Sequence, residues 1–211
     1  MQSKKRTFLC LCIFAALVVA APTVMAAESP GTAAVRKANE TIKGLLKKEA
    51  QPGSAQEKKL ASQVTKSVRG FLDVSELGRR SMRDHWSKLS KKQHKAFLTV
   101  LTELIEKNYV LGLRSNLDYA VEYSSEKKDG DNILVETAIQ DKASTSSRAI
   151  SVDYVLHKHK GKLRAFDVIT DGVGLVENYR AMFNKLIAKE GFEGLLSRMK
   201  RKRDSLAAPP P

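Results

Sequence analysis

Cysteine is missing from most of the chain. Both cysteines of the 211-residue sequence, Cys10 and Cys12, lie within its first 26 residues. Beyond residue 26 the chain can therefore form no disulfide and offers no thiol for catalysis or metal binding. A lipoprotein signal is excluded as well, because Leu9 and Leu11 stand where a small residue would have to precede the cysteine.

Long apolar runs are also scarce, and the one at the start of the chain is short. Phe8–Ala21 is apolar, follows basic residues at 4–6 and precedes small residues that end at Ala26. This run is shorter than the roughly 20 apolar residues that a membrane-spanning helix needs. The pattern predicts a secretory signal peptide over residues 1–26, cleaved after Ala26, with a membrane anchor as the competing interpretation.

Acidic residues are too few to balance the basic ones, since 23 Asp and Glu accompany 37 Lys and Arg, for a formal net charge of +14. Cleavage after Ala26 would remove Lys4, Lys5 and Arg6 and lower this charge from +14 to +11. In an exported chain, such a charge favours anionic lipid or acidic protein partners. Nucleic acid is disfavoured, because the sequence lacks aromatic residues that could stack bases on a basic sheet.

Catalytic signatures are lacking too. No serine stands in a nucleophile elbow. The Gly172–Gly174 loop does not match a dinucleotide-binding loop, because Glu177 replaces its third glycine. Asp167 and Asp171 could pair as acid and base, although a hydrogen-bonded turn and a helix cap are the favoured roles. The sequence therefore predicts no enzymatic activity and no cofactor.

One pair of histidines has the spacing of a metal site. His157 and His159 point the same way at the end of an expected strand, which suits two ligands of one ion. Lys158, Lys160 and Lys162 surround them, and no nearby cysteine or carboxylate completes a ligand set. We therefore expect no metal site.

What the sequence does show is a change in the spacing of its apolar residues along the chain. Apolar residues recur at helical spacing as far as about Arg114, and Ser54, Asp73 and Ser90 each begin a capping signal. These features predict four helices, over residues 33–48, 54–72, 73–82 and 90–114.

Alternation with period two replaces helical spacing after Asn116. It predicts an antiparallel sheet of about four strands in two hairpins, the second of which turns at Gly161 with positive φ. The expected strands are Tyr119–Tyr123, Ile133–Ile139, Ile150–Leu156 and Leu163–Ile169.

Helical spacing returns after the Gly172–Gly174 bend, which is either a hinge or a fixed turn. The helix from Leu175 is expected to stop at Gly191, before a short last helix and a disordered tail at 206–211. Residues 27–205 should therefore form one α+β domain, in which a twisted antiparallel sheet packs against a helical bundle.

Several segments together resemble a known family. They are Phe71–Gly78, His85–Ser90, Ile150–Leu156, Phe166–Val168, Asp171–Leu175 and Asn178–Arg180. In this combination the chain resembles the MlaC family of periplasmic phospholipid-binding proteins, also called toluene-tolerance ABC-transporter auxiliary proteins. It departs from the family pattern at Leu163, where tryptophan is usual, and at Asp171–Gly174, where a Glu-Gly-Val-Ser run is usual.

The resemblance implies a periplasmic shuttle of the Mla lipid-transport pathway. Such a protein would carry phospholipid between an outer-membrane lipoprotein complex and an inner-membrane ABC transporter that has a substrate-binding ring. The lipid would lie in a cavity between the sheet and the helices, although the same residues could pack a solid core instead. Two alternatives stay open: a relative that serves hopanoid transport, and a periplasmic adaptor that binds protein partners without carrying lipid.

Apolar residues on the inward faces of the expected elements are the candidate lipid-binding residues. They are Phe71, Leu77, Met82, Trp86, Phe97, Leu101, Ile105, Tyr109, Val135, Val152, Tyr154, Phe166, Val168, Val173, Leu175, Tyr179 and Phe183.

Overall fold

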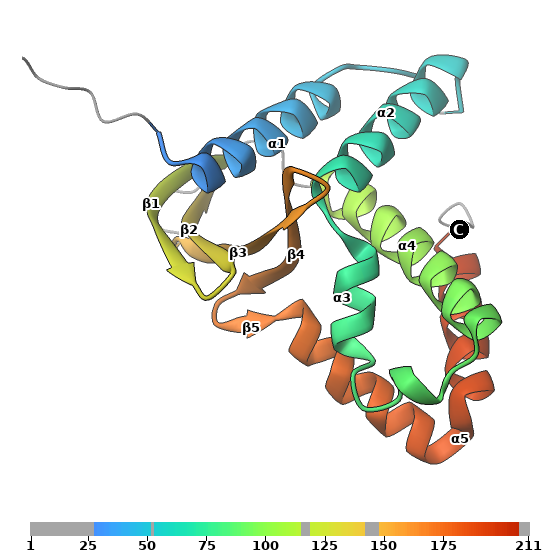
Figure 1. Ribbon diagram of the computed structural model, residues 1–211. Helices are drawn as coiled ribbons and strands as arrows, with labels where there is room; N and C mark the ends of the chain where they lie inside the picture. Colours follow the sequence, from blue (N-terminus) through green and yellow to red (C-terminus); the bar gives the residue numbers. More distant parts are fainter. Residues whose placement is uncertain (1–27, 52, 115–118, 142–147, 207–211) are drawn as a thin grey trace, which may run out of the picture.

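The structure, a computed structural model, describes residues 28–51, 53–114, 119–141 and 148–206, without the side chains of residues 109–114. The expected signal peptide at 1–26 and most of the expected tail, residues 207–211, lie outside the described residues. Figure 1 places the sheet at the left, α1 and α2 along the top, and α3, α4 and α5 together at the right.

The helices occupy the four segments that the apolar spacing predicts before residue 115, and one long segment after the sheet. They are α1 (Pro30–Leu46), α2 (Ala55–Phe71), α3 (Val74–Ser81), α4 (Lys91–Arg114) and α5 (Leu175–Ser205), with a short 3₁₀ helix at Trp86–Lys88. Among the described residues, none of these helices combines the length and the apolar character needed to cross a bilayer.

The three predicted capping signals are confirmed. The side chains of Ser54, Asp73 and Ser90 each accept a hydrogen bond from the backbone N–H three residues later, at 3.1, 3.2 and 3.3 Å. The carboxylate of Glu57 in turn accepts from the backbone N–H of Gly53 at 2.7 Å. Each contact satisfies an amide that has no partner within its helix, which fixes where α2, α3 and α4 begin.

The sheet is an antiparallel meander. Its strands are β1 (Tyr119–Asp129), β2 (Asn132–Asp141), β3 (Ile150–His159), β4 (Lys162–Thr170) and β5 (Val173–Gly174), and they lie in chain order. The α+β prediction is thus confirmed, with one strand more than the expected four. β5 has only two residues and arises because Ile169 pairs with Gly174 across the turn.

The register of the sheet brings apolar side chains to one face. Val135 of β2 pairs with Tyr154 of β3, which pairs with Val168 of β4. Directly paired residues of antiparallel strands point to the same side. This face, here called the inner face, turns toward α1.

A bulge interrupts the alternation of β4. Leu156 pairs with Ala165 while Val155 pairs with Asp167, so Phe166 is an extra residue in β4. Ala165 and Phe166 are consequently both buried although they are adjacent. The simple alternation expected for this strand is therefore wrong at Phe166.

The last helix changes direction at Gly191. This residue has φ +68° and ψ 178°, which is not helical, so α5 consists of two helical segments. The stop that we predict at Gly191 is confirmed, and the segment after it continues to Ser205, further than the short helix expected there.

Two glycines hold the bend before α5 in different ways. Gly172 has φ +82°, a conformation that other residues adopt at a cost. Gly174 has an ordinary φ, but a Cβ there would come within 3.0 Å of the Asp167 carboxylate. These constraints favour the fixed turn over the hinge, because each glycine is required by one defined geometry.

Replacing Gly172 by alanine should therefore lower the free energy of unfolding by about 1 kcal/mol, because alanine is strained at positive φ. The matched control is Gly70→Ala near the end of α2, where a Cβ meets nothing within 4 Å. That variant should be as stable as the wild type or more stable by up to about 1 kcal/mol. Urea denaturation measures both changes, and an undiminished stability of Gly172→Ala would contradict the fixed turn.

Candidate functional site

One apolar cluster joins the inner face of the sheet to the helices. Val135 and Leu156 of the sheet, Leu77 of α3, Phe97 of α4 and Phe183 of α5 all belong to it, and each exposes no more than 1% of its surface. Since these residues come from β2, β3 and three helices, the cluster is where the sheet and the helical layer meet.

Most candidate lipid-binding residues lie in this cluster. Those that are buried in it are Leu77, Met82, Phe97, Leu101, Ile105, Val135, Tyr154, Phe166 and Phe183. Those that are partly buried and pack against it are Phe71, Trp86, Val152, Val168, Leu175 and Tyr179.

Two candidates stand apart. Val173 is 59% exposed in β5, because it lies on the short edge strand beyond the turn at Gly172. The structure therefore does not bring Val173 to the cluster. The side chain of Tyr109 lies outside the described residues.

Aromatic contacts tie the helices of the cluster to one another. The rings of Phe97 and Phe183 meet edge to face with centroids 5.4 Å apart, and Tyr179 stacks on Phe183 at the same distance. On the sheet side, Phe71 meets Tyr154 edge to face at 5.9 Å. The contact of Phe97 with Phe183 holds α4 against α5, and that of Phe71 with Tyr154 holds the end of α2 against the inner face.

A polar group that sequence reasoning missed lies on the inner face. Asn39 of α1 donates a hydrogen bond to the Tyr123 hydroxyl at 3.3 Å and accepts one from the Tyr154 hydroxyl at 3.5 Å. Burial raises the pKa of Tyr154 to about 12, so its phenol stays neutral. Asn39 thus anchors α1 to two strands, and only its position on the inward face of α1 could have indicated this.

A small hollow of about 180 Å³ opens beside these residues, between α1 and β1. The Arg36 guanidinium lies over the Tyr123 ring at 4.0 Å, and the Lys43 ammonium lies over the Tyr119 ring at 4.3 Å. The hollow therefore combines two cations with the aromatic edge of the inner face.

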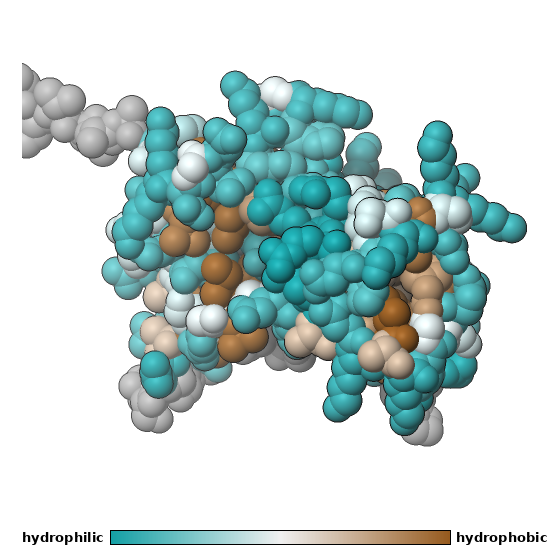
Figure 2. Space-filling view, turned by 60° about the horizontal axis from the view of Figure 1, so that its bottom comes forward, coloured by the Kyte–Doolittle hydropathy of each residue, from teal (hydrophilic) through white to brown (hydrophobic). Residues whose placement is uncertain are grey.

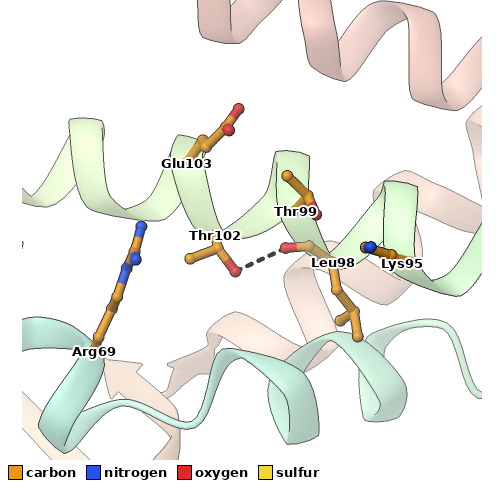
Figure 3. Close-up of a pocket in the computed structure, with 6 residues that line it drawn as sticks. All are labelled: Arg69, Lys95, Leu98, Thr99, Thr102 and Glu103. Carbon is orange, nitrogen blue, oxygen red and sulfur yellow. Dashed lines mark hydrogen bonds between the residues drawn. The ribbon is translucent and has the colours of Figure 1, made fainter.

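A larger pocket of about 550 Å³ lies between the end of α2 and the middle of α4 (Figure 3). Arg69 comes from α2, while Lys95 and Glu103 come from α4, and these three lining side chains are charged. Arg69 also forms a two-pronged ion pair with the buried Glu106. None of the lining residues is a candidate lipid-binding residue, and the sequence pattern did not indicate this pocket.

Much of the surface in Figure 2 is hydrophilic, with separate apolar areas over the sheet at the left and over the helices at the right. The exposed large apolar side chains among the described residues are Ile150, Val173 and Met182. Most of the apolar content of the described domain therefore lies inside it.

The two aspartates that could have acted as acid and base have structural roles. Asp167 accepts hydrogen bonds from the backbone N–H groups of Val168 at 2.9 Å and Val176 at 3.1 Å, which caps α5. Asp171 accepts from the backbone N–H of Ser151 at 3.1 Å. The favoured interpretation, a turn and a helix cap, is confirmed.

The predicted histidine pair has a partner that we did not expect. The carboxylate of Asp73, at the start of α3, lies 3.1 Å from a ring nitrogen of His157 and of His159. Among the described residues, these three form the one group with the composition and closeness of a metal site.

The fold and the cluster define an α+β protein in which an antiparallel meander closes on a helical layer around one apolar interior. The model of the family described as MlaC protein matches residues 36–201, so the chain belongs to that family. The resemblance seen in the sequence is confirmed.

Two relatives support the assignment. The intermembrane phospholipid transport system binding protein MlaC of Haemophilus influenzae is 20% identical over 133 residues, which are 62% of each chain. The chain thus matches less than two thirds of that relative's length. The structure of a phospholipid-binding protein from Ralstonia solanacearum, in complex with a phospholipid, superposes with a TM-score of 0.72. It is 19% identical, and the match covers 85% of this chain and 100% of the other, which shows a shared fold.

The ion pairs of Glu76 in α3 predict how the stability of the protein depends on pH. Hydrogen bonds from Arg79 and Arg80 lower the pKa of Glu76 to about 2. Its carboxylate therefore contributes stability above its unfolded pKa of about 4.3, and this contribution is lost as the pH falls toward about 2.

Glu76→Gln should destabilise the protein at pH 7 by about 1 kcal/mol, a modest amount because Arg79 is half exposed and solvent screens the pair. The difference from the wild type should shrink between about pH 4.3 and 2. Urea denaturation at several pH values measures it. Glu122→Gln, at an exposed position of β1, is the control and should show no such difference at any pH.

Proposed function

We propose that this protein binds a phospholipid in the periplasm and carries it between an outer-membrane lipoprotein complex and an inner-membrane ABC transporter of the Mla pathway. The observation that carries the proposal is the apolar cluster that joins the inner face of the sheet to helices α1 to α5. The names of the two relatives agree with it, since one is a phospholipid transport binding protein and the other holds a phospholipid.

The energetics of lipid in water require such an interior. Two acyl chains contain roughly 30 methylenes, and at about 0.8 kcal/mol each their exposure would cost about 24 kcal/mol. A carrier must therefore enclose nearly the whole apolar length of its cargo. The proposed function assigns the protein no chemical step, so it is a carrier and not an enzyme.

The hollow between α1 and β1 is the proposed place where the head group meets solvent. Arg36 and Lys43 lie at its rim together with Glu40, and their positive charges suit a phosphate that would replace Glu28 as the partner of Arg36. Its volume of about 180 Å³ is below the roughly 300 Å³ at which ligand pockets begin. Loading would therefore separate α1 from the sheet. That step would break the hydrogen bonds that hold α1 there, among them those of Thr32, Asn39 and Lys43.

Val152→Arg tests the interior directly. Val152 packs against the cluster from the inner face, so a buried guanidinium there should remove most uptake of fluorescent phospholipid from vesicles. Ser124→Arg, at an exposed position of β1, adds the same charge and should take up lipid as the wild type does. Circular dichroism checks that both variants are folded. Normal uptake by a folded Val152→Arg variant would refute the assignment of the interior.

The net positive charge of the chain allows a second test, which concerns binding to the two partner complexes. With a net charge of +11 after loss of residues 1–26, docking onto either membrane complex should be steered by the basic surface. Exposed charges are screened beyond about 8 Å at physiological salt, so high salt should lower the association rate at least severalfold and change the dissociation rate less. Surface plasmon resonance with either complex measures both rates, and rates that are equal at low and high salt would contradict electrostatic steering.

A further inference from the structure

The geometry points to a zinc-binding site formed by Asp73, His157 and His159, which is independent of the proposed lipid function. The three side chains offer one ligand atom each, and these atoms all lie within 4.8 Å of one another. The site joins the start of α3 to the end of β3, far apart in sequence but adjacent in space.

The ligand atoms lie at distances that suit a small cation. Oδ2 of Asp73 is 3.1 Å from Nε2 of His157 and 3.1 Å from Nδ1 of His159. Around zinc, with ligand bonds of about 2.0–2.1 Å, neighbouring ligand atoms in a tetrahedron are about 3.3 Å apart. The two Asp73 distances thus need to change by only a few tenths of an ångström for the ion to replace the His157 hydrogen bond and the His159 ion-pair contact.

The residue types favour zinc over magnesium or calcium. Two imidazoles and one carboxylate are ligands that zinc prefers, whereas magnesium and calcium prefer oxygen alone. The Asp73 side chain is only 3% exposed, but that of His159 is 38% exposed, so water can reach the remaining coordination position.

The surroundings of the ligands hold them in position. The other carboxylate oxygen of Asp73, Oδ1, accepts the backbone N–H of Glu76 at 3.2 Å, and the Asp73 backbone N–H donates to the Ala165 carbonyl. The His157 ring meets Phe166 edge to face at 5.3 Å. Such outer contacts orient metal ligands and fix which atom faces the ion.

One neighbour opposes a cation and limits the affinity. Nη1 of Arg164 lies 3.8 Å from Oδ2 of Asp73, and its Nη2 is held by the carbonyls of Arg69 and Leu72 at 2.6 and 2.7 Å. This fixed positive charge should weaken zinc binding to the micromolar range. The ion would clamp the sheet to α3, so bound zinc should raise the melting temperature.

Isothermal titration of the full chain with zinc chloride tests the site, using protein that carries no affinity tag. The wild type should bind one zinc ion per chain and melt at a higher temperature when zinc is present. His159→Gln and Asp73→Asn should each weaken binding at least tenfold and lose the rise in melting temperature. Asparagine keeps an acceptor for the cap of α3, and His159 is partly exposed, so both variants should fold.

The matched control is His85→Gln, which removes a histidine that contacts Asn184 at 2.9 Å, away from the proposed site. It should bind zinc as the wild type does. An absence of zinc binding by the wild type would overturn the proposal. So would wild-type affinity in His159→Gln, since the ion would then lie elsewhere.

Discussion

Closure of the sheet by the helices is the constraint on which the rest of the structure depends. Val135, Tyr154 and Leu156 make one side of the sheet apolar. An apolar sheet face is stable only when another layer of the protein covers it. α1 lies against this face, and Phe71 at the end of α2 packs on Tyr154. Phe97 and Phe183 continue the same cluster in α4 and α5, which their aromatic contact holds together. Each layer therefore depends on the other for the burial of its apolar surface.

The polar contacts of Asp73 join α3 to β4 beside the apolar cluster. Asp73 caps α3, and its backbone N–H donates to the Ala165 carbonyl next to the bulge of β4. The preceding Leu72 forms a bridge to Ala165 as well. The position of α3, which brings Leu77 and Met82 into the cluster, is thus set by a polar contact at its first turn and by apolar packing along its length.

Local patterns predict the elements well because their causes are local. Caps such as that at Ser90 depend on a side chain and an amide three residues apart, and the apolar period reports which face of each element is buried. The same apolar period predicts most of the candidate residues that lie in the cluster, and the family resemblance adds the arrangement of sheet and helices.

Contacts between distant segments could not be predicted in this way. Asp73 and His157 are separated by 84 positions, so nothing near the histidines in the sequence reveals their carboxylate. The bulge at Phe166 depends on how β4 pairs with β3, and the place of Asn39 depends on how α1 lies on the sheet. These features follow from tertiary packing, which overrides the simple period of each element.

Native mass spectrometry of the wild-type protein, purified from the periplasm without detergent, tests the central claim most directly. The carrier account predicts a mass equal to the processed chain plus one two-chain phospholipid, and solvent extraction should recover that lipid. A chain that carries no lipid would contradict the account and leave the adaptor interpretation, whereas a bound hopanoid would contradict the proposed cargo.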